Sequence, residues 1–302
     1  MEREYKTGTK VLAATGLIMV TIIWGGSFVV MKSSVDKVPP GYLLALRFTA
    51  AAAAMMAAFP KSLRRLNRES LQNGILVGIV LELSYLLQTY GIKYTTASKN
   101  AFITALYVIL VPFLSWAVNR KKPGLNNLLA AVLAVAGLGL LTLRGVTAVN
   151  FGDFLTFLCS LSFTVHLVLA ERFTKNQDPI LLAIIQVAVV GVLNWILAPF
   201  LDGFQAFSFE ILRDRTLVAG ILYLSIFCTM AAYAIQMVGQ KILTASASSL
   251  LLSLEAVFGT IFSVIFLKEV LTGKMIVGCV LMFFALVISG IHFETNGKEV
   301  HG

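Results

Sequence analysis

The sequence predicts an all-α polytopic membrane protein, in which ten transmembrane helices form a 5+5 inverted repeat. Three observations support this fold class. The 302 residues are 58% hydrophobic and only 13% charged, with a mean hydropathy of +0.87. The apolar residues gather in ten runs, and closely similar sequences occur at 84–98 and at 232–246.

The composition excludes an ordinary water-soluble domain, in which about 25% of residues are charged. A soluble core of this length could not bury all the apolar surface, so a membrane protein follows. The net charge of +9 does not indicate nucleic-acid binding, because the basic residues lie in short gaps between apolar runs. The three cysteines lie inside apolar runs without the spacing of metal ligands, so we expect no cofactor and no metal.

Each apolar run has the length of about 20 residues that a helix needs to cross the hydrocarbon core. The first run follows basic residues but lacks a convincing cleavage site, so we interpret it as a retained span. Proline, glycine and charged residues separate the runs, as in DKVPPGY and NRKKPGLNN, and the longest gap, DGFQAFSFEILRDR, predicts a short interfacial helix. The predicted spans are 11–31, 41–59, 71–92, 98–118, 125–143, 153–173, 179–200, 216–238, 246–267 and 274–293.

The distribution of Lys and Arg predicts the orientation, because these residues are enriched in cytoplasmic loops. With the amino terminus in the cytoplasm, the inside segments hold more basic residues than the outside segments, and nearly all of this bias comes from the first half. Ten crossings return the carboxyl terminus to the same side. We therefore expect a multi-pass protein of the cell membrane with both termini cytoplasmic.

The two similar sequences, SYLLQTYGIKYTTAS and AYAIQMVGQKILTAS, align without a gap and share their Thr-Ala-Ser ending. We interpret 146–302 as a second copy of the unit in 1–145. Because five spans is an odd number, the copy enters the membrane from the opposite side, and inverted repeats of this kind are a transporter architecture. The two sequences are 148 residues apart. The residue pairs related by this offset include Tyr85 and Tyr233, Gln88 and Gln236, and Tyr107 and Glu255.

Three longer segments resemble a known family. They are IIWGGSFVVMK at 22–32, VPPGYLLALRF at 38–48 and ASASSLLLSLEAVFGTIFSVIFLKEVLTGKMIVGCVLM at 245–282. In this order they resemble the drug/metabolite transporter superfamily, EamA type, over essentially the whole chain. The resemblance implies a ten-helix carrier of small metabolites, often amino acids. It also implies a central cavity lined mainly by the first, third, fourth, sixth, eighth and ninth helices.

Ionisable side chains at membrane depth mark candidate functional sites, because they are unfavourable there unless they are paired or wetted. Glu82 lies on one helical stripe with Tyr85 and is a candidate to line a wet path and to couple protons. Its alternative role is a structural pairing with Arg47. Glu255 and His166 are candidates for substrate binding or proton coupling, and the alternative for each is a hydrogen-bonded contact between helices. We expect Arg47 to tie the second helix to its neighbours.

Aromatic and amide side chains complete the predicted site. Trp24 precedes two glycines and is expected either to stack on a substrate or to pack between helices, while Pro112 predicts a kink in the fourth span. Polar residues that the repeat relates are the best candidates for the cavity wall. The predicted substrate-binding residues are Trp24, Glu82, Tyr85, Gln88, Tyr107, His166, Tyr233, Gln236 and Glu255.

These features favour a secondary transporter, with export favoured, that moves amino acids or related amphipathic solutes across the cytoplasmic membrane by alternating access. The sequence has no Gly-rich phosphate loop, so the substrate gradient or protons would supply the energy. The expected partners are a small-molecule substrate, the lipid bilayer and protons. Two alternatives stay open. The lack of a catalytic constellation argues against an intramembrane enzyme, and the repeat argues against a membrane assembly protein without flux.

Overall fold

The computed structural model describes residues 5–120, 124–142, 150–204, 206–266 and 273–290. These residues form helices and connecting turns without a strand, which confirms the predicted all-α class for the described part of the chain. The first half contains α1 (Thr7–Val35), α2 (Pro40–Ala58), α3 (Pro60–Leu63), α4 (Arg68–Tyr94), α5 (Ala97–Ala105), α6 (Tyr107–Asn119) and α7 (Leu125–Thr142).

The second half repeats this order of helices, with a short helix between its second and third segments. That short helix, η1, lies within the longest predicted gap. The elements are α8 (Phe151–Thr174), α9 (Pro179–Asp202), η1 (Phe209–Arg213), α10 (Arg215–Ser225), η2 (Ile226–Ala231), α11 (Ala232–Ile242), α12 (Ala245–Leu252), α13 (Glu255–Phe266) and α14 (Gly273–Gly290).

Eight helical segments of the described chain are long and apolar enough to cross a membrane. Three of them are interrupted helices, namely α5–α6, α10–η2–α11 and α12–α13. Helices α7 and α14 contain shorter apolar stretches, Leu128–Gly137 and Ile276–Ala285. The last residues of the predicted spans 125–143, 246–267 and 274–293 lie outside the described residues.

Polar side chains fix where several long helices begin. Asn67 and Asn150 each form a capping box at the start of α4 and α8, with the side chain accepting from the backbone N–H three residues later. Asp214 caps α10 and pairs with Lys37 at 2.6 Å, and this hydrogen-bonded cation lowers the pKa of the Asp214 carboxyl. Local sequence therefore determines the starts of these helices.

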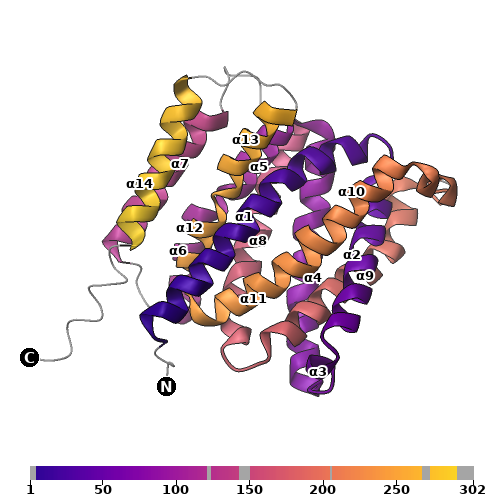
Figure 1. The fold of residues 1–302 in the computed structure, drawn as a ribbon, viewed down its shortest axis with the longest axis horizontal. Coiled ribbons are helices and arrows are strands. Elements are labelled where there is room, and N and C mark those ends of the chain that lie inside the picture. The colour runs from indigo at the N-terminus through magenta and orange to yellow at the C-terminus, as the bar shows by residue number, and fades with distance from the viewer. Residues whose placement is uncertain (1–4, 121–123, 143–149, 205, 267–272, 291–302) are drawn as a thin grey trace, which may run out of the picture.

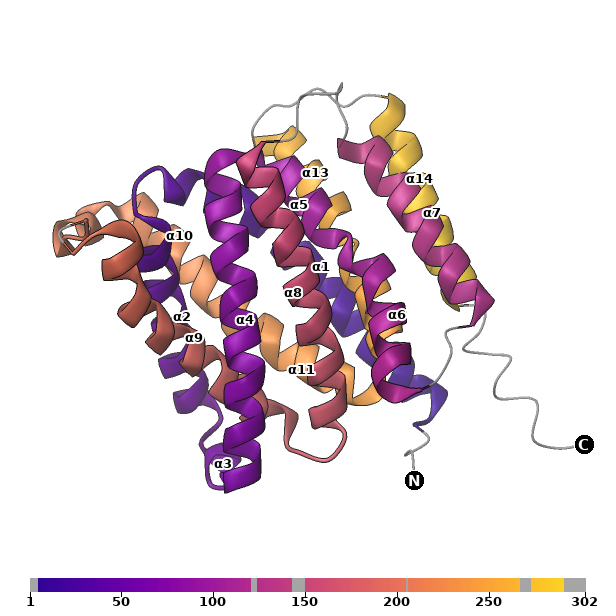
Figure 2. The ribbon, with the colours of Figure 1, turned by 180° about the vertical axis from the view of Figure 1, so that it is seen from behind.

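Counterpart helices of the two repeats form the two edges of the bundle. Helices α2 and α9 pack together along one edge, and α7 and α14 pack together along the other (Figures 1 and 2). The remaining long helices lie between these pairs, where α1 packs against α11 and α13, and α8 packs against α4, α5 and α6. This pairing of equivalent helices is the arrangement that a two-fold relation between the repeats produces.

The two Thr-Ala-Ser turns lie at opposite ends of the bundle (Figure 1). Thr96 caps α5 by accepting from the N–H of Lys99 at 3.2 Å, and Thr244 caps α12 by accepting from the N–H of Ala247 at 3.2 Å. The similar sequences thus form the same local structure, but α4 and α11 run in opposite directions.

The fourth and ninth segments are interrupted at equivalent positions. In each, the N–H of a leucine, Leu106 or Leu254, bonds the carbonyl three residues earlier at 3.2 Å, a tighter turn than an α-helix makes. The sequence predicts a kink at Pro112, but the interruption lies at Leu106, and Pro112 lies inside α6. The second repeat is interrupted in the same way, although Thr260 occupies the position of Pro112. The interruption therefore belongs to the repeat and does not depend on proline.

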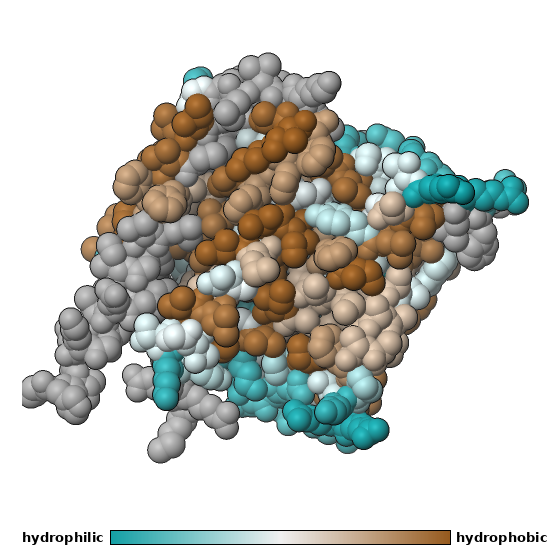
Figure 3. Space-filling model, in the orientation of Figure 1, coloured by the Kyte–Doolittle hydropathy of each residue, from teal (hydrophilic) through white to brown (hydrophobic). Residues whose placement is uncertain are grey.

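The surface of the bundle matches a membrane setting. Figure 3 shows hydrophobic side chains across the middle of the molecule and hydrophilic ones gathered toward its two ends. Large exposed apolar side chains cover α1, α4 and α9, among them Met19, Leu83 and Ile196. In water such a continuous apolar surface would be unfavourable, whereas lipid chains accommodate it.

Candidate functional site

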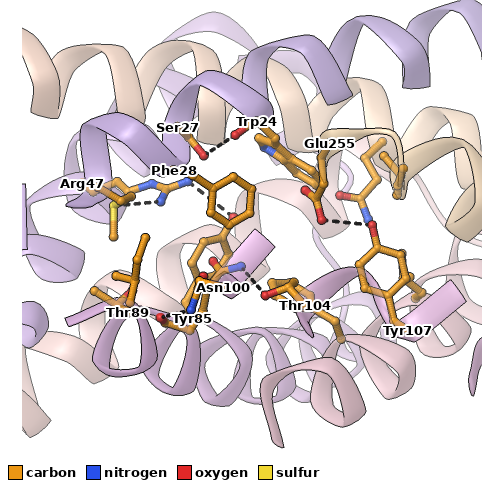
Figure 4. A pocket seen from close by; sticks show the side chains of 17 residues that line it. Trp24, Ser27, Phe28, Arg47, Tyr85, Thr89, Asn100, Thr104, Tyr107 and Glu255 are labelled. Carbon is orange, nitrogen blue, oxygen red and sulfur yellow. Dashed lines mark hydrogen bonds between the residues drawn. The ribbon is translucent and has the colours of Figure 1, made fainter. Parts of the chain in front are cut away.

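A cavity lies between the helices of the two repeats (Figure 4). Its wall contains side chains from all six segments that the family resemblance implies, and one additional residue, Arg47, comes from α2. The lining residues are Trp24, Ser27, Phe28, Met31, Arg47, Tyr85, Gln88, Thr89, Ile92, Asn100, Thr104, Tyr107, Phe163, Leu167, Gln236, Leu252 and Glu255.

Two pairs of repeat-related residues meet at hydrogen-bonding distance. The hydroxyl of Tyr233 donates to the hydroxyl of Tyr85 at 2.9 Å, and the hydroxyl of Tyr107 donates to Glu255 Oε1 at 3.1 Å. Both pairs are separated by 148 residues in the sequence. Equivalent residues of two related units touch each other only close to the axis that relates the units. The axis therefore runs beside the cavity.

The structure brings six of the nine predicted residues to the cavity wall. Tyr233 lies next to this wall, because its buried ring is 5.6 Å from that of Trp24, centroid to centroid, and its hydroxyl contacts Tyr85. The two other predicted residues, Glu82 and His166, do not line the cavity. The six that do are Trp24, Tyr85, Gln88, Tyr107, Gln236 and Glu255.

Glu82 and His166 both hold α9 to its neighbours. The amide of Asn194 donates to Glu82 and joins α9 to α4, and His166 Nε2 is 2.8 Å from Gln186 Oε1, which joins α8 to α9. Asn194 contacts only Oε2 of Glu82, and Oε1 has no partner among the described residues. The predicted structural pairing of Glu82 with Arg47 is not formed. His166 therefore has the hydrogen-bonded helix contact of its alternative role, whereas Glu82 makes a helix contact with a partner other than the predicted Arg47.

Arg47 is buried at the cavity without an acidic partner. Its Nε donates to Thr229 Oγ1 at 2.8 Å, whereas Nη2 is 3.4 Å from both the Tyr85 hydroxyl and the carbonyl of Cys228, and Nη1 is 3.7 Å from Met31 Sδ. None of the ion pairs between described residues includes this guanidinium. In the sequence this group is a lone arginine within an otherwise uncharged span, which predicts only a structural tie.

The partners of Arg47 come from an irregular turn that the sequence does not predict. Segment η2 is a π-helix, in which Thr229 Oγ1 donates to the carbonyl of Leu224, five residues earlier, at 2.8 Å. The carbonyl of Cys228 in this turn accepts the indole N–H of Trp24 at 2.8 Å. The π-helix thus supplies hydrogen-bond acceptors to both Trp24 and Arg47 at the cavity wall.

Several polar atoms of the cavity wall are unused. Thr89 Oγ1, Asn100 Oδ1 and Gln236 Oε1 are buried and have no hydrogen-bond partner among the described residues. A buried polar group without a partner costs about 1–3 kcal/mol, so these atoms favour a polar solute or water in the cavity. Among the described residues, no group of His, Cys, Asp or Glu side chains could hold a metal ion.

At each end of the bundle a charged side chain forms hydrogen bonds with the backbone of a turn, the α4–α5 turn at one end and the α11–α12 turn at the other. Near the end of α1, Lys32 Nζ donates to the carbonyls of Ile92 at 2.9 Å and Thr95 at 3.0 Å, which belong to the last turn of α4. At the equivalent place in α8, Glu171 Oε2 accepts the N–H of Ala245 at 2.9 Å, in the first turn of α12. A cation at a helix carboxyl end and an anion at a helix amino end are both favourable. These two contacts, called the ties below, therefore involve side chains of opposite charge and hold the turns at opposite ends of the bundle.

The comparisons with known proteins agree with this architecture. The EamA-like transporter family matches residues 11–143 and again residues 150–291. A protein of Archaeoglobus fulgidus named "Uncharacterized transporter" is 31% identical over 279 residues, which cover 92% of this chain and 86% of that protein. A "Probable amino-acid metabolite efflux pump" of Salmonella typhimurium is 22% identical and covers 92% of this chain and 95% of its own length.

A solved crystal structure shares the fold, with a TM-score of 0.75 and 17% sequence identity over 92% of this chain and 98% of that chain. The names of the family and of these relatives indicate a transporter rather than an enzyme. With the family's unit present twice around one cavity, the chain belongs to the EamA-like transporter family and is a multi-pass membrane transporter.

Proposed function

We propose that the protein is a secondary transporter that carries small amphipathic metabolites, amino acids among them, through the cavity by alternating access. The observation that carries the proposal is the contact of Tyr85 with Tyr233 and of Tyr107 with Glu255 across the repeat axis. A cavity beside such an axis can be sealed from one face by one repeat and from the other face by the inverted repeat.

In this proposal α7 and α14 also cross the bilayer, which gives ten spans in two inverted sets of five. In support, α1 begins and α14 ends at the same end of the bundle, as an even number of crossings requires (Figure 1). The exposed side chains of Arg65 and Arg68 lie near α3 at this end. Cytoplasmic loops attract such basic residues, so we assign both termini to the cytoplasm and the protein to the cell membrane.

The two ties offer a physical basis for alternation. Lys32 holds the α4–α5 turn to α1, and Glu171 holds the α11–α12 turn to α8. We expect the cavity to open toward one face when the tie at that face is released and the other tie is kept. Each turn leads into an interrupted segment, α5–α6 or α12–α13, where fewer regular hydrogen bonds resist bending.

Export of amino acids is the favoured direction, because the relatives from Salmonella typhimurium and Escherichia coli carry the name of probable amino-acid metabolite efflux pumps. Glu255 is the favoured group for proton coupling. Its carboxyl group lines the cavity and accepts from Tyr107, so a bound proton would change the charge that a substrate meets.

Counterflow in proteoliposomes tests the proposal. Vesicles with purified protein are loaded with an unlabelled solute and diluted into the same solute carrying a radioactive label, across a panel of amino acids, organic acids and amines. We expect transient accumulation of label for at least one solute, and no accumulation in vesicles without protein. Absence of counterflow for amino acids, organic acids and amines alike would favour a membrane assembly protein that carries no flux.

A further inference from the structure

We propose that Arg47 binds the anionic group of the substrate, so that the transported solutes carry a carboxylate. This inference rests on the proposed function and names the substrate class for the same cavity. It assigns a recognition role to a residue for which the sequence predicts only a structural tie.

The first argument is the unpaired charge. Arg47 is only 2% exposed, and no carboxylate of a described residue lies within ion-pair distance of its guanidinium. A buried ion without a counter-ion has a desolvation penalty of several kcal/mol. An anion that enters the cavity from water would supply the missing charge, and it would gain charge-assisted hydrogen bonds in return.

The second argument is the number of donors left available. A guanidinium has five N–H donors in a planar fork. Only the Nε donor of Arg47 makes a short bond, to Thr229, while the contacts of Nη1 and Nη2 are 3.4 Å or longer. The two terminal nitrogens therefore make only long contacts, which the two oxygens of a carboxylate would replace with shorter ones in a matching geometry.

The third argument comes from the equivalent position in the second repeat. In the first two spans the two halves are offset by 139 residues, as the prolines that begin α2 and α9 show. This offset pairs Arg47 with Gln186 of α9. Gln186 is neutral, lies outside the cavity wall and joins helices through His166. A neutral amide thus suffices for a helix tie at this place in the fold, so the charge of Arg47 is explained by something that the cavity binds.

The guanidinium is also held in a fixed orientation. Its Cζ lies 4.8 Å from the ring centroid of Tyr85 and 5.2 Å from that of Phe48, and the π-helix supplies Thr229. Aromatic faces stabilise a cation without neutralising it. Because the fork is already oriented, an anion would bind without first paying to order the side chain.

The other charged group of the wall stays apart from Arg47. Glu255 accepts from Tyr107 at 3.1 Å, and Figure 4 shows Arg47 and Glu255 on opposite sides of the cavity. The two charges do not form an ion pair, so each is left to a ligand or to water. A solute with a carboxylate near Arg47 and a cationic amine toward Glu255 would complement both ends of the cavity.

Matched probes test this inference by binding rather than by flux. We would measure the affinity of purified protein in detergent for L-leucine, 4-methylpentanoate and L-leucinol, and for the corresponding phenylalanine set. The members of each set share a side chain and differ in the amine or the carboxylate. We expect the carboxylate-bearing members of at least one set to bind at least tenfold more tightly than the alcohol.

The variant Arg47→Gln introduces the residue found at the equivalent position and keeps a donor for Thr229. We expect it to abolish the preference for the carboxylate while the weak affinity for the alcohol is unchanged, and Arg47→Lys to restore part of the preference. Equal binding of acid and alcohol, a preference that survives in Arg47→Gln, or no binding of any probe would overturn the inference.

The comparison on the wild-type protein remains decisive if Arg47→Gln does not fold. The result also separates the two proposals. Carboxylate binding without counterflow would contradict transport and leave the role of Arg47 intact. Counterflow of amines or neutral solutes, with no preference for carboxylates, would contradict the role of Arg47 and leave transport intact.

Discussion

Three buried ionisable residues that the sequence predicts for the site, Glu82, His166 and Glu255, differ in what they touch. Glu82 and His166 each form a hydrogen bond with an amide side chain of α9, whereas Glu255 contacts a tyrosine at the cavity wall. Their positions in the sequence do not distinguish these residues, because all three lie well inside apolar runs. Of the three, only Glu255 lines the cavity, whereas Glu82 and His166 form hydrogen bonds with α9.

This distinction predicts different effects of two conservative substitutions. Glu255→Gln keeps the shape and the bond to Tyr107 but cannot gain or lose a proton. We expect it to flatten the pH dependence of transport between about pH 5.5 and 8 if Glu255 couples protons. Uptake by proteoliposomes over this pH range measures the effect.

Glu82→Gln is the matched control, because it makes the same chemical change in a carboxyl group outside the cavity wall. We expect its pH profile to follow that of the wild type. An unchanged profile for Glu255→Gln would remove Glu255 from the coupling mechanism.

At the scale of elements, the close approach of helices limits which side chains fit. A Cβ atom at Gly25 would lie 2.5 Å from Phe258 Cβ and 2.7 Å from the backbone nitrogen of Gly259, so α1 and α13 touch through their backbones. A Cβ at Gly152 would lie 2.6 Å from the carbonyl oxygen of Gly91, which brings α8 equally close to α4. Small residues allow this packing in membranes.

We therefore expect Gly25→Ala to destabilise the protein by about 1–3 kcal/mol, since α1 must move away from α13. The melting temperature of purified protein in detergent should fall. Gly8→Ala is the matched control on the same helix, because nothing lies within 4 Å of a Cβ at that position. Equal melting temperatures for the two variants would argue against the close contact.

The two ties lead to a prediction about access. We expect Lys32→Met to release the α4–α5 turn and Glu171→Gln to weaken the hold on the α11–α12 turn, since each removes a charge from a helix end. A single cysteine at Ser27, in a variant without native cysteines, reports access to the cavity. Its reaction with an impermeant thiol reagent should increase from opposite faces in the two variants.

Lys175→Met is the control for the second tie, because Lys175 bonds Glu171 Oε1, whereas the turn is held by Oε2. It should alter access less than Glu171→Gln does. If both tie variants increased the reaction from the same face, or if neither changed it, the ties would have no role in gating.

At the scale of the whole molecule, the number of crossings determines the topology. The repeat-related residues Lys93 and Lys241 follow the third and eighth predicted spans. If α7 crosses the bilayer, these two residues lie on opposite sides. If α7 lies on the surface instead, the intervening number of crossings becomes even and both residues lie on one side.

Cysteine substitutions at these two positions, each made without the native cysteines, distinguish the two arrangements. We expect Lys93→Cys to react with an impermeant reagent from the outside of intact cells, and Lys241→Cys only after permeabilisation. Labelling of both from one side would exclude the inverted repeat of five spans.

The sequence by itself determined the all-helical class, the duplicated unit and six of the residues that line the cavity. Hydropathy is a property of each residue summed along the chain, so apolar runs identify membrane helices without knowledge of their neighbours. The repeat offset also identified Tyr85 and Tyr233, and Tyr107 and Glu255, as related pairs, and these pairs meet at the axis.

Only the tertiary structure decided which polar side chains form hydrogen bonds between helices and which face the cavity. Asn194 and Gln186 form hydrogen bonds with Glu82 and His166. The π-helix at 226–231 directs the carbonyl of Cys228 toward Trp24 and Arg47. These outcomes depend on the rotation of each helix about its own axis and on partners that are distant in the sequence. Such contacts leave no local pattern, and they arise only when the helices pack.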